Sequence, residues 1–202
     1  MLKKERLIWL FLVFLISGCV NSTYTKQELE RQVKAKYPIV GFIDEFVETH
    51  PNFDNNDVTR EQADTDFVKA FAEASDSVNL LRNIPVELCS INKNSNGDVY
   101  AQFRSWRNNN LPQPINRVNF DVICRIDSTY VESLSDDSCY LIYGKLIKRI
   151  ETIDVFRALL GRPTIVYTYE FNVRKDGVRN DKYEVNLGML FFEIDSICPY
   201  TR

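Results

Sequence analysis

The spacing of the apolar residues changes near Pro85, and this change decides which folds the chain can adopt. Before Pro85, apolar residues recur at steps of three and four, as at Phe67, Phe71 and Ala74, which is the period of an amphipathic helix. After Pro85, and most regularly in residues 118–126, apolar and polar residues alternate, as in a strand with one wet face. We therefore predict an α+β fold, with N-terminal helices packed on a curved antiparallel sheet.

Three helices are predicted before the change of period. Thr25 and Glu28 form a capping-box pattern that begins the first helix. Pro38 suits the first turn of the second helix, because the proline nitrogen has no hydrogen to leave unpaired there. An Asn- and Asp-rich linker follows, and Thr59 or Asp64 is expected to cap the third helix.

About five to seven strands are predicted after Pro85. Gly144 and Gly188 fall inside two long strands and are candidate bulges, because a residue without Cβ permits a sharp local bend. Residues 152–160 are predicted to form one or two helical turns, and residues 165–173 a further strand.

Counted from Val99, the expected order is three strands, a short helix and two strands. This order is similar to an OB-fold, and the resemblance covers residues 99–197 through topology alone. A partly open OB-like barrel is our preferred arrangement. An open antiparallel sheet or a sandwich fits the same periodicity.

The first residues of the chain have the order of an export signal. Three basic residues precede an apolar run over residues 7–16, which is followed by small residues and Cys19. The run has ten residues, whereas a membrane-spanning helix needs roughly 20. Residues 1–18 are therefore predicted to be a signal peptide.

Residues 16–19 resemble the lipobox of bacterial lipoproteins, in which two small residues precede the lipidated cysteine. The resemblance implies that Cys19 becomes the new N-terminus and carries diacylglycerol and an acyl chain such as palmitate, because several chains are needed for a durable anchor. Val20 in place of Asp favours the outer membrane if the host has one. The alternative is an ordinary signal peptide with an incidental Cys19.

These observations predict the organisation of the whole chain. We expect a signal peptide over residues 1–18, a lipidated tether over 19–24, a helical part over 25–83 and an antiparallel β part over 84–202, with the last two parts packed as one domain. The formal net charge is −3, so no general positive field favours a nucleic acid as partner.

Four cysteines lie beyond the anchor, and their spacing contains no C-x-x-C pair. In an exported protein, an even number permits two disulfides with three connectivities. Four thiols that act as small apolar side chains are the alternative. A zinc site is disfavoured, and no metal or cofactor is predicted. The candidate disulfide cysteines are Cys89, Cys124, Cys139 and Cys198.

No catalytic arrangement emerges from the chain. The single histidine, His50, lies where a helix is predicted to end, so we interpret it as a capping residue rather than a general base. The sequence has no G-x-S-x-G elbow, and its glycines are too dispersed to surround a phosphate. The acidic residues Asp127, Glu132, Asp136 and Asp137 are interpreted as a solvated turn, since their spacing differs from a calcium-binding loop.

The most suggestive surface is one face of the strand that begins at Val99. Tyr100, Arg104 and Trp106 should project from it, with Arg107 just beyond. Aromatic and guanidinium groups together stack on sugars or bases and are frequent in interfaces. If the helices cover this face, Tyr100 and Trp106 belong to the core instead.

The sequence supports two hypotheses about function. The first is a non-catalytic envelope lipoprotein, anchored in the membrane by its lipid, that binds an unidentified protein partner or a glycan. The second is an envelope hydrolase that uses a pair of carboxylates, which would have to converge in a pocket.

Overall fold

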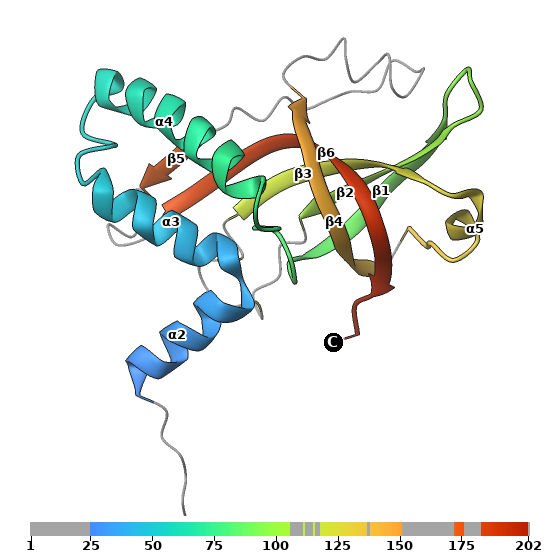
Figure 1. The fold of residues 1–202 in the computed structure, drawn as a ribbon, viewed down its shortest axis with the longest axis horizontal. Coiled ribbons are helices and arrows are strands. Elements are labelled where there is room, and N and C mark those ends of the chain that lie inside the picture. The colour runs from blue at the N-terminus through green and yellow to red at the C-terminus, as the bar shows by residue number, and fades with distance from the viewer. Residues whose placement is uncertain are drawn as a thin grey trace, which may run out of the picture. The chain divides into compact units, whose positions relative to one another are not determined.

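The structure is a computed structural model that describes residues 25–105, 111, 115, 118–136, 138–150, 172–175 and 183–201 (Figure 1). The chain divides into two compact units, residues 1–32 and residues 33–202. Within the described residues, the second unit contains the sheet together with two long helices and one short helix. The predicted signal peptide, Cys19 and the rest of the tether lie outside the described residues.

The first two described helices begin where the sequence predicts. Helix α2 (Lys26–Lys36) follows Thr25, whose Oγ1 accepts a hydrogen bond of 3.2 Å from the backbone N–H of Glu28. Helix α3 (Pro38–Thr49) has its proline in the first turn and ends at His50, whose backbone N–H donates to the carbonyl oxygens of Phe46 and Val47. The capping role predicted for His50 is therefore confirmed.

The third described helix, α4 (Asp57–Ser75), begins earlier than predicted. Its cap is Asn56 rather than Thr59 or Asp64. The Asn56 Oδ1 accepts from the Thr59 N–H at 3.0 Å, and the Thr59 Oγ1 accepts from the Asn56 N–H at 3.1 Å. This reciprocal pair satisfies two helix-end donors at once, so Thr59 takes part in the cap from inside the helix.

The strands form a mixed sheet of six, in the order β3-β2-β1-β4-β6-β5, and a further pairing of β3 with β6 closes five of them into a barrel. Every neighbouring pair is antiparallel except β3 and β6, which are parallel. The strands are β1 (Pro85–Lys93), β2 (Val99–Ser105), β3 (Val118–Ile126), β4 (Cys139–Ile150), β5 (Asn172–Lys175) and β6 (Tyr183–Pro199). The α+β class and the barrel-like curvature agree with the prediction.

One detail of the predicted order is wrong, because the barrel begins with β1 at Pro85 rather than at Val99. A short helix that was not predicted, α5 (Ser128–Val131), lies between β3 and β4. The wet face predicted for residues 118–126 is also wrong, because Asn119 and Asp121 are buried and Arg125 is the exposed residue of β3. The helix predicted over residues 152–160 lies outside the described residues, as does most of the strand predicted over 165–173.

Both glycines that were predicted as bulges lie at register shifts. The β4–β6 ladder shifts between Tyr143 and Gly144, where a Cβ on the glycine would collide with the backbone carbonyl oxygen of Glu193. On β6, two residues lie between Asn186 and Met189 where β3 has only one between their partners. Gly188 has a φ of +64° there, a conformation that favours glycine.

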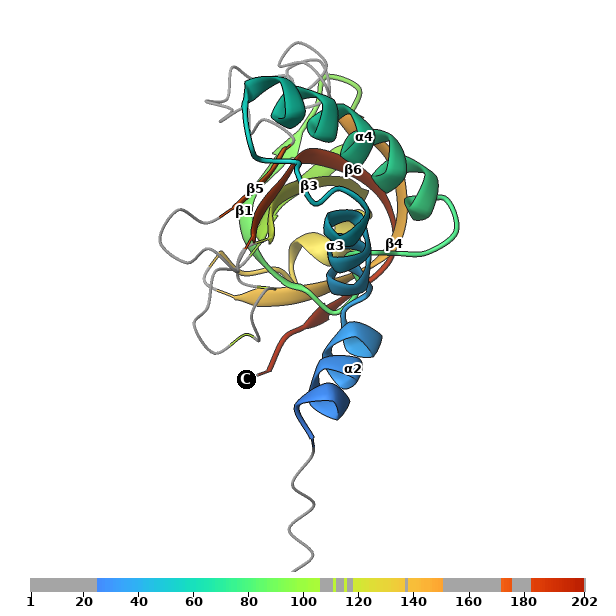
Figure 2. The ribbon, with the colours of Figure 1, turned by 90° about the vertical axis from the view of Figure 1, so that its left-hand side faces the viewer.

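The hydrophobic core fills the barrel and continues to the helices of the same unit. Figure 2 shows α3 in front of the ring of strands, with α4 crossing beside it. Phe67 of α4, Ile43 of α3 and Phe103 of β2 are each at most 1% exposed. The backbone N–H of Ile39 also donates to the carbonyl oxygen of Leu80, at 3.1 Å. The two helices are thus joined to the barrel through its core.

Candidate functional site

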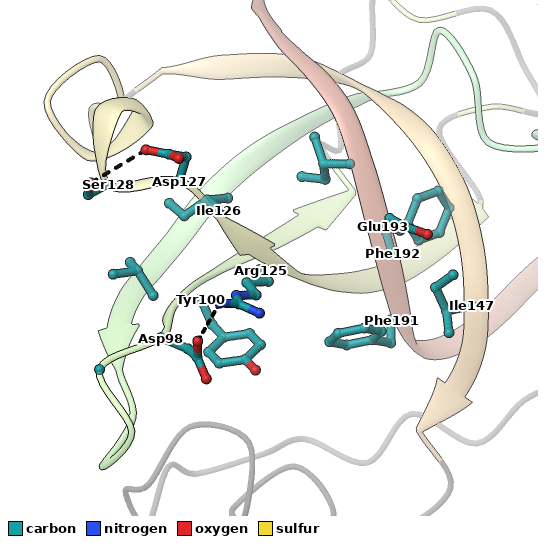
Figure 3. A pocket seen from close by; sticks show the side chains of 13 residues that line it. Asp98, Tyr100, Arg125, Ile126, Asp127, Ser128, Ile147, Phe191, Phe192 and Glu193 are labelled. Carbon is teal, nitrogen blue, oxygen red and sulfur yellow. Dashed lines mark hydrogen bonds and ion pairs between the residues drawn. The ribbon is translucent and has the colours of Figure 1, made fainter.

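A pocket of about 810 Å³ opens on the barrel beside the β1–β2 turn (Figure 3). Strands β2, β3, β4 and β6 contribute to it, together with the β1–β2 turn and the start of α5, although these segments are far apart in the sequence. Its lining consists of Gly97, Asp98, Val99, Tyr100, Arg125, Ile126, Asp127, Ser128, Ile147, Phe191, Phe192, Glu193 and Ile194. The size is that of a site for a small molecule or a few sugar units.

Two aromatic rings form the apolar part of the pocket. Tyr100 on β2 is only 7% exposed, and the half-buried Phe191 on β6 lies with its ring centroid 6.4 Å from that of Tyr100, at an interplanar angle of 49°. Ile147 on β4 is 47% exposed and lies beyond Phe191 (Figure 3). Together these residues present apolar surface from three strands to one opening.

The register of the paired strands places these two rings close together on the outer face of the barrel. Tyr100 is paired with Arg125 across the β2–β3 ladder, and Phe191 is paired with Ile123 across the β3–β6 ladder. Because Ile123 and Arg125 are two residues apart on β3, all four side chains lie on the same face. The parallel β3–β6 pairing therefore places Phe191 near Tyr100.

An ion pair joins the β1–β2 turn to β3 at the rim. The Nη2 of Arg125 lies 2.6 Å from the Oδ1 of Asp98. Asn94 holds Asp98 from the other side, since its Nδ2 donates to the Asp98 Oδ2 at 3.2 Å and its Oδ1 accepts from the Asp98 N–H at 2.9 Å. Gly97, with a φ of +90°, allows the tight turn between them.

Asp127 lies in the pocket lining but serves the start of helix α5. Its Oδ1 accepts from the backbone N–H of Thr129 at 2.9 Å. That hydrogen bond is the main reason that the pKa of the Asp127 carboxyl lies below its usual value. The carboxylate is therefore ionised at neutral pH and is unsuited to act as a general acid.

The described lining carries more negative than positive charge. Asp98, Asp127 and Glu193 contribute three carboxylates, and Arg125 contributes one guanidinium. A phosphate-rich ligand would be repelled by this arrangement, because it has no cluster of cations. Neutral ligands with hydroxyl groups, or ligands with a positive charge, fit it better.

Arg104, which the sequence suggested as a binding residue, lies outside the pocket lining and is bonded to β3. Its Nε and Nη2 donate to the two carboxylate oxygens of Asp121, at 2.9 and 3.2 Å. The side chain of Asp121 is 2% exposed and also accepts from the Gln102 Nε2 at 3.1 Å. These two charge-assisted hydrogen bonds fix the guanidinium of Arg104 against Asp121 of β3.

The sequence therefore identified part of the site. Tyr100 lies in the pocket, Arg104 lies outside its lining, and Trp106 and Arg107 lie outside the described residues. Sequence reasoning missed Phe191 and Asp98. A signal for Phe191 existed, because Phe191 alternates with core residue Phe192 within a long predicted strand, but its closeness to Tyr100 depends on a long-range pairing.

All four candidate disulfide cysteines are thiols in the structure. Cys124 is buried in the barrel, Cys89 and Cys198 are exposed, and Cys139 is intermediate. Burial raises the pKa of the Cys124 thiol well above its ordinary value. Among the described residues, no group of three or more His, Cys, Asp or Glu side chains has the geometry of a metal site.

Two further findings concern features other than this pocket. Within its described part, none of the helices has the length and apolar character that a bilayer-spanning segment requires. Comparison with protein-family models, with curated proteins and with solved structures gives no match to this chain.

Proposed function

We propose that the protein is a lipid-anchored lipoprotein of the bacterial cell envelope and that its OB-like barrel is a non-catalytic module that binds a glycan. The pocket beside Tyr100 and Phe191 carries the second part of this proposal. The lipobox resemblance at residues 16–19 supports the first part.

The chemistry of the pocket favours a neutral glycan over other ligands. Sugar rings have apolar faces that stack on aromatic side chains, and their hydroxyl groups bond to charged groups at the edge. Phe191 and Ile147 supply accessible apolar surface, and Arg125 with Asp98 supplies donors and acceptors beside it. The excess of carboxylates disfavours nucleic acids and other polyanions.

The same residues give no support to the hydrolase hypothesis. That reaction needs one carboxyl held protonated near a second carboxylate. Asp98 is paired with Arg125, and Asp127 has a lowered pKa because it caps α5. Binding without catalysis is therefore the function that the described lining supports best.

Binding can be tested with the full-length, lipid-modified protein in detergent. We expect a soluble neutral oligosaccharide of N-acetylhexosamines to bind, and Phe191→Ala to weaken its affinity at least tenfold, about 1.4 kcal/mol. Val58→Ser is the matched control, because Val58 is 77% exposed on α4 and is not part of the pocket lining. Isothermal titration calorimetry provides the affinities.

Each result has a defined meaning. Unchanged affinity in Phe191→Ala would contradict the choice of pocket. If no neutral oligosaccharide binds but a protein co-purifies from native membranes in a Phe191-dependent manner, the ligand is a protein segment rather than a glycan. The anchor is tested separately by mass spectrometry of the N-terminal peptide, in which Cys19→Ser should abolish acylation.

A further inference from the structure

Three of the four cysteines lie together on the outer face of neighbouring strands. Cys139 on β4 is paired with Glu87 across the β1–β4 ladder, and Cys89, the extra residue at a register shift of β1, follows two residues later and is exposed. On the other side, Leu141 of β4 is paired with Cys198 of β6. Because Cys139 and Leu141 are two residues apart, Cys139 and Cys198 share this face.

Exposure confirms which side of the barrel these thiols occupy. Their neighbours Leu88 and Tyr140 are core residues, whereas Cys89 is exposed and Cys139 is intermediate. Cys124 points the opposite way: it is 0% exposed among the core residues, and its Sγ lies 3.5 Å from the carbonyl oxygen of Ala101. A sheet separates Cys124 from the other three, so it cannot bond to any of them without unfolding.

We propose that mild oxidation of the folded protein forms a single disulfide between Cys139 and Cys198, and leaves Cys89 and Cys124 as thiols. With Cys124 excluded, none of the three two-disulfide connectivities is available to the folded chain. Cys139 is the middle member of the three, so the remaining question is whether it bonds to Cys198 or to Cys89.

The strand pairing favours Cys198 over Cys89 as the disulfide partner of Cys139. The β4–β6 pairing is continuous there, since Tyr140 is paired with Pro199 and the backbone N–H of Tyr200 donates to the carbonyl oxygen of Cys139 at 2.8 Å. Diagonal neighbours on paired strands are about 7–8 Å apart between Cα atoms. A disulfide requires less than about 6.8 Å, so a movement of roughly 1 Å at the end of β6 is enough.

Cys89 is a less favourable disulfide partner for Cys139, for two reasons. The β1–β4 ladder has only three residue pairs and ends at Glu87, before Cys89. The atoms around Cys89 also shield its sulfur from part of the solvent and raise the pKa of the thiol, which reduces the fraction present as the reactive thiolate.

The reaction is an ordinary thiol–disulfide exchange with a small disulfide such as oxidised glutathione. One protein thiolate attacks a glutathione sulfur and releases one glutathione thiolate. The second protein thiolate then attacks the protein sulfur of the mixed disulfide and releases the other glutathione. The two thiol protons pass to the released glutathione, so one glutathione disulfide is reduced for each protein disulfide that forms.

Trypsin separates the four cysteines onto four peptides, which makes the test direct. They are residues 83–93 for Cys89, 118–125 for Cys124, 126–145 for Cys139 and 183–202 for Cys198. The full chain is incubated with oxidised glutathione, alkylated, unfolded, alkylated with a second reagent and digested without reduction. We expect one linked pair, 126–145 with 183–202, and peptide 118–125 labelled only by the second reagent.

Variants of the exposed positions supply the controls. Cys89→Ser should retain the linked pair, and Cys198→Ser should lose it, with thermal unfolding used to show that both variants remain folded. A link between 83–93 and 126–145, a mixed glutathione disulfide without an internal link, or a disulfide-linked dimer in place of the internal bond would each overturn the proposal.

Discussion

Removal of Arg104 should destabilise the protein through the carboxylate that it leaves behind. Asp121 accepts two hydrogen bonds from Arg104 and one from Gln102, and its side chain is 2% exposed. In Arg104→Ala, this buried carboxylate keeps only the Gln102 amide among its described partners. Breaking a buried ion pair by removing one partner costs about 3–5 kcal/mol.

The lower end of that range applies, because the Arg104 side chain is 41% exposed and water can reach part of the pair. We therefore expect a loss of about 3 kcal/mol in the free energy of unfolding. For a domain of this size, that loss lowers Tm by roughly 6–12 °C. Urea unfolding followed by circular dichroism gives the free energy, and calorimetry gives Tm.

A double-mutant cycle separates the pair from the rest of the fold. Arg104→Ala with Asp121→Ala should cost less than the two single substitutions added together, with a coupling of about 1–3 kcal/mol. If Arg104→Ala costs less than about 1 kcal/mol, as an ordinary surface substitution does, or if the coupling is zero, then the Arg104–Asp121 pair does not stabilise the fold.

Three other substitutions have defined outcomes. Gly144→Ala should lower Tm strongly or prevent soluble expression, because its Cβ would collide with the Glu193 backbone; an unchanged melting curve would contradict the bulge geometry. Gly41→Ala should stabilise the protein by about 0.5–1 kcal/mol, since this position lies inside α3 and the nearest atom to the new Cβ is 4.0 Å away; a loss of stability in urea unfolding would refute the available space. Asp127→Ala should reduce stability most at neutral pH. The folded-state pKa of Asp127 is lowered, so the contribution of its carboxylate is complete above the unfolded value near 4 and is lost as the pH falls through the folded value; a stability difference that grows on acidification would contradict it.

Local features of the fold could be predicted from sequence to the extent that neighbouring residues determine them. Pro38, His50 and the two bulge glycines act through their own backbone, and each lies where the sequence placed it. The cap of α4 was misplaced because both Asn56 and Thr59 suit a helix start, and only their reciprocal hydrogen bonds show which residue is outside the helix.

The site could be predicted only in part, because it depends on contacts between distant segments. Alternation on β2 placed Tyr100 and Arg104 on one face, but it could not show that Arg104 is paired with Asp121 from β3. Likewise, the parallel β3–β6 register, which brings Phe191 to Tyr100, has no short-range sequence signal.

The bulge at Gly144 is a local feature, predicted from the sequence, that also affects the pocket formed by distant segments. The missing Cβ lets β4 approach the backbone of Glu193 and Ile194, and both of these residues line the pocket. The Asn79 Nδ2 also donates to the Gly144 carbonyl oxygen at 3.0 Å, which fixes the bend from the segment after α4. Ile147 lies at a second register shift, between Leu146 and Lys148, so its position relative to Phe191 depends on both irregularities of β4. A glycine recognisable from sequence therefore shapes a pocket whose other residues the sequence could not bring together.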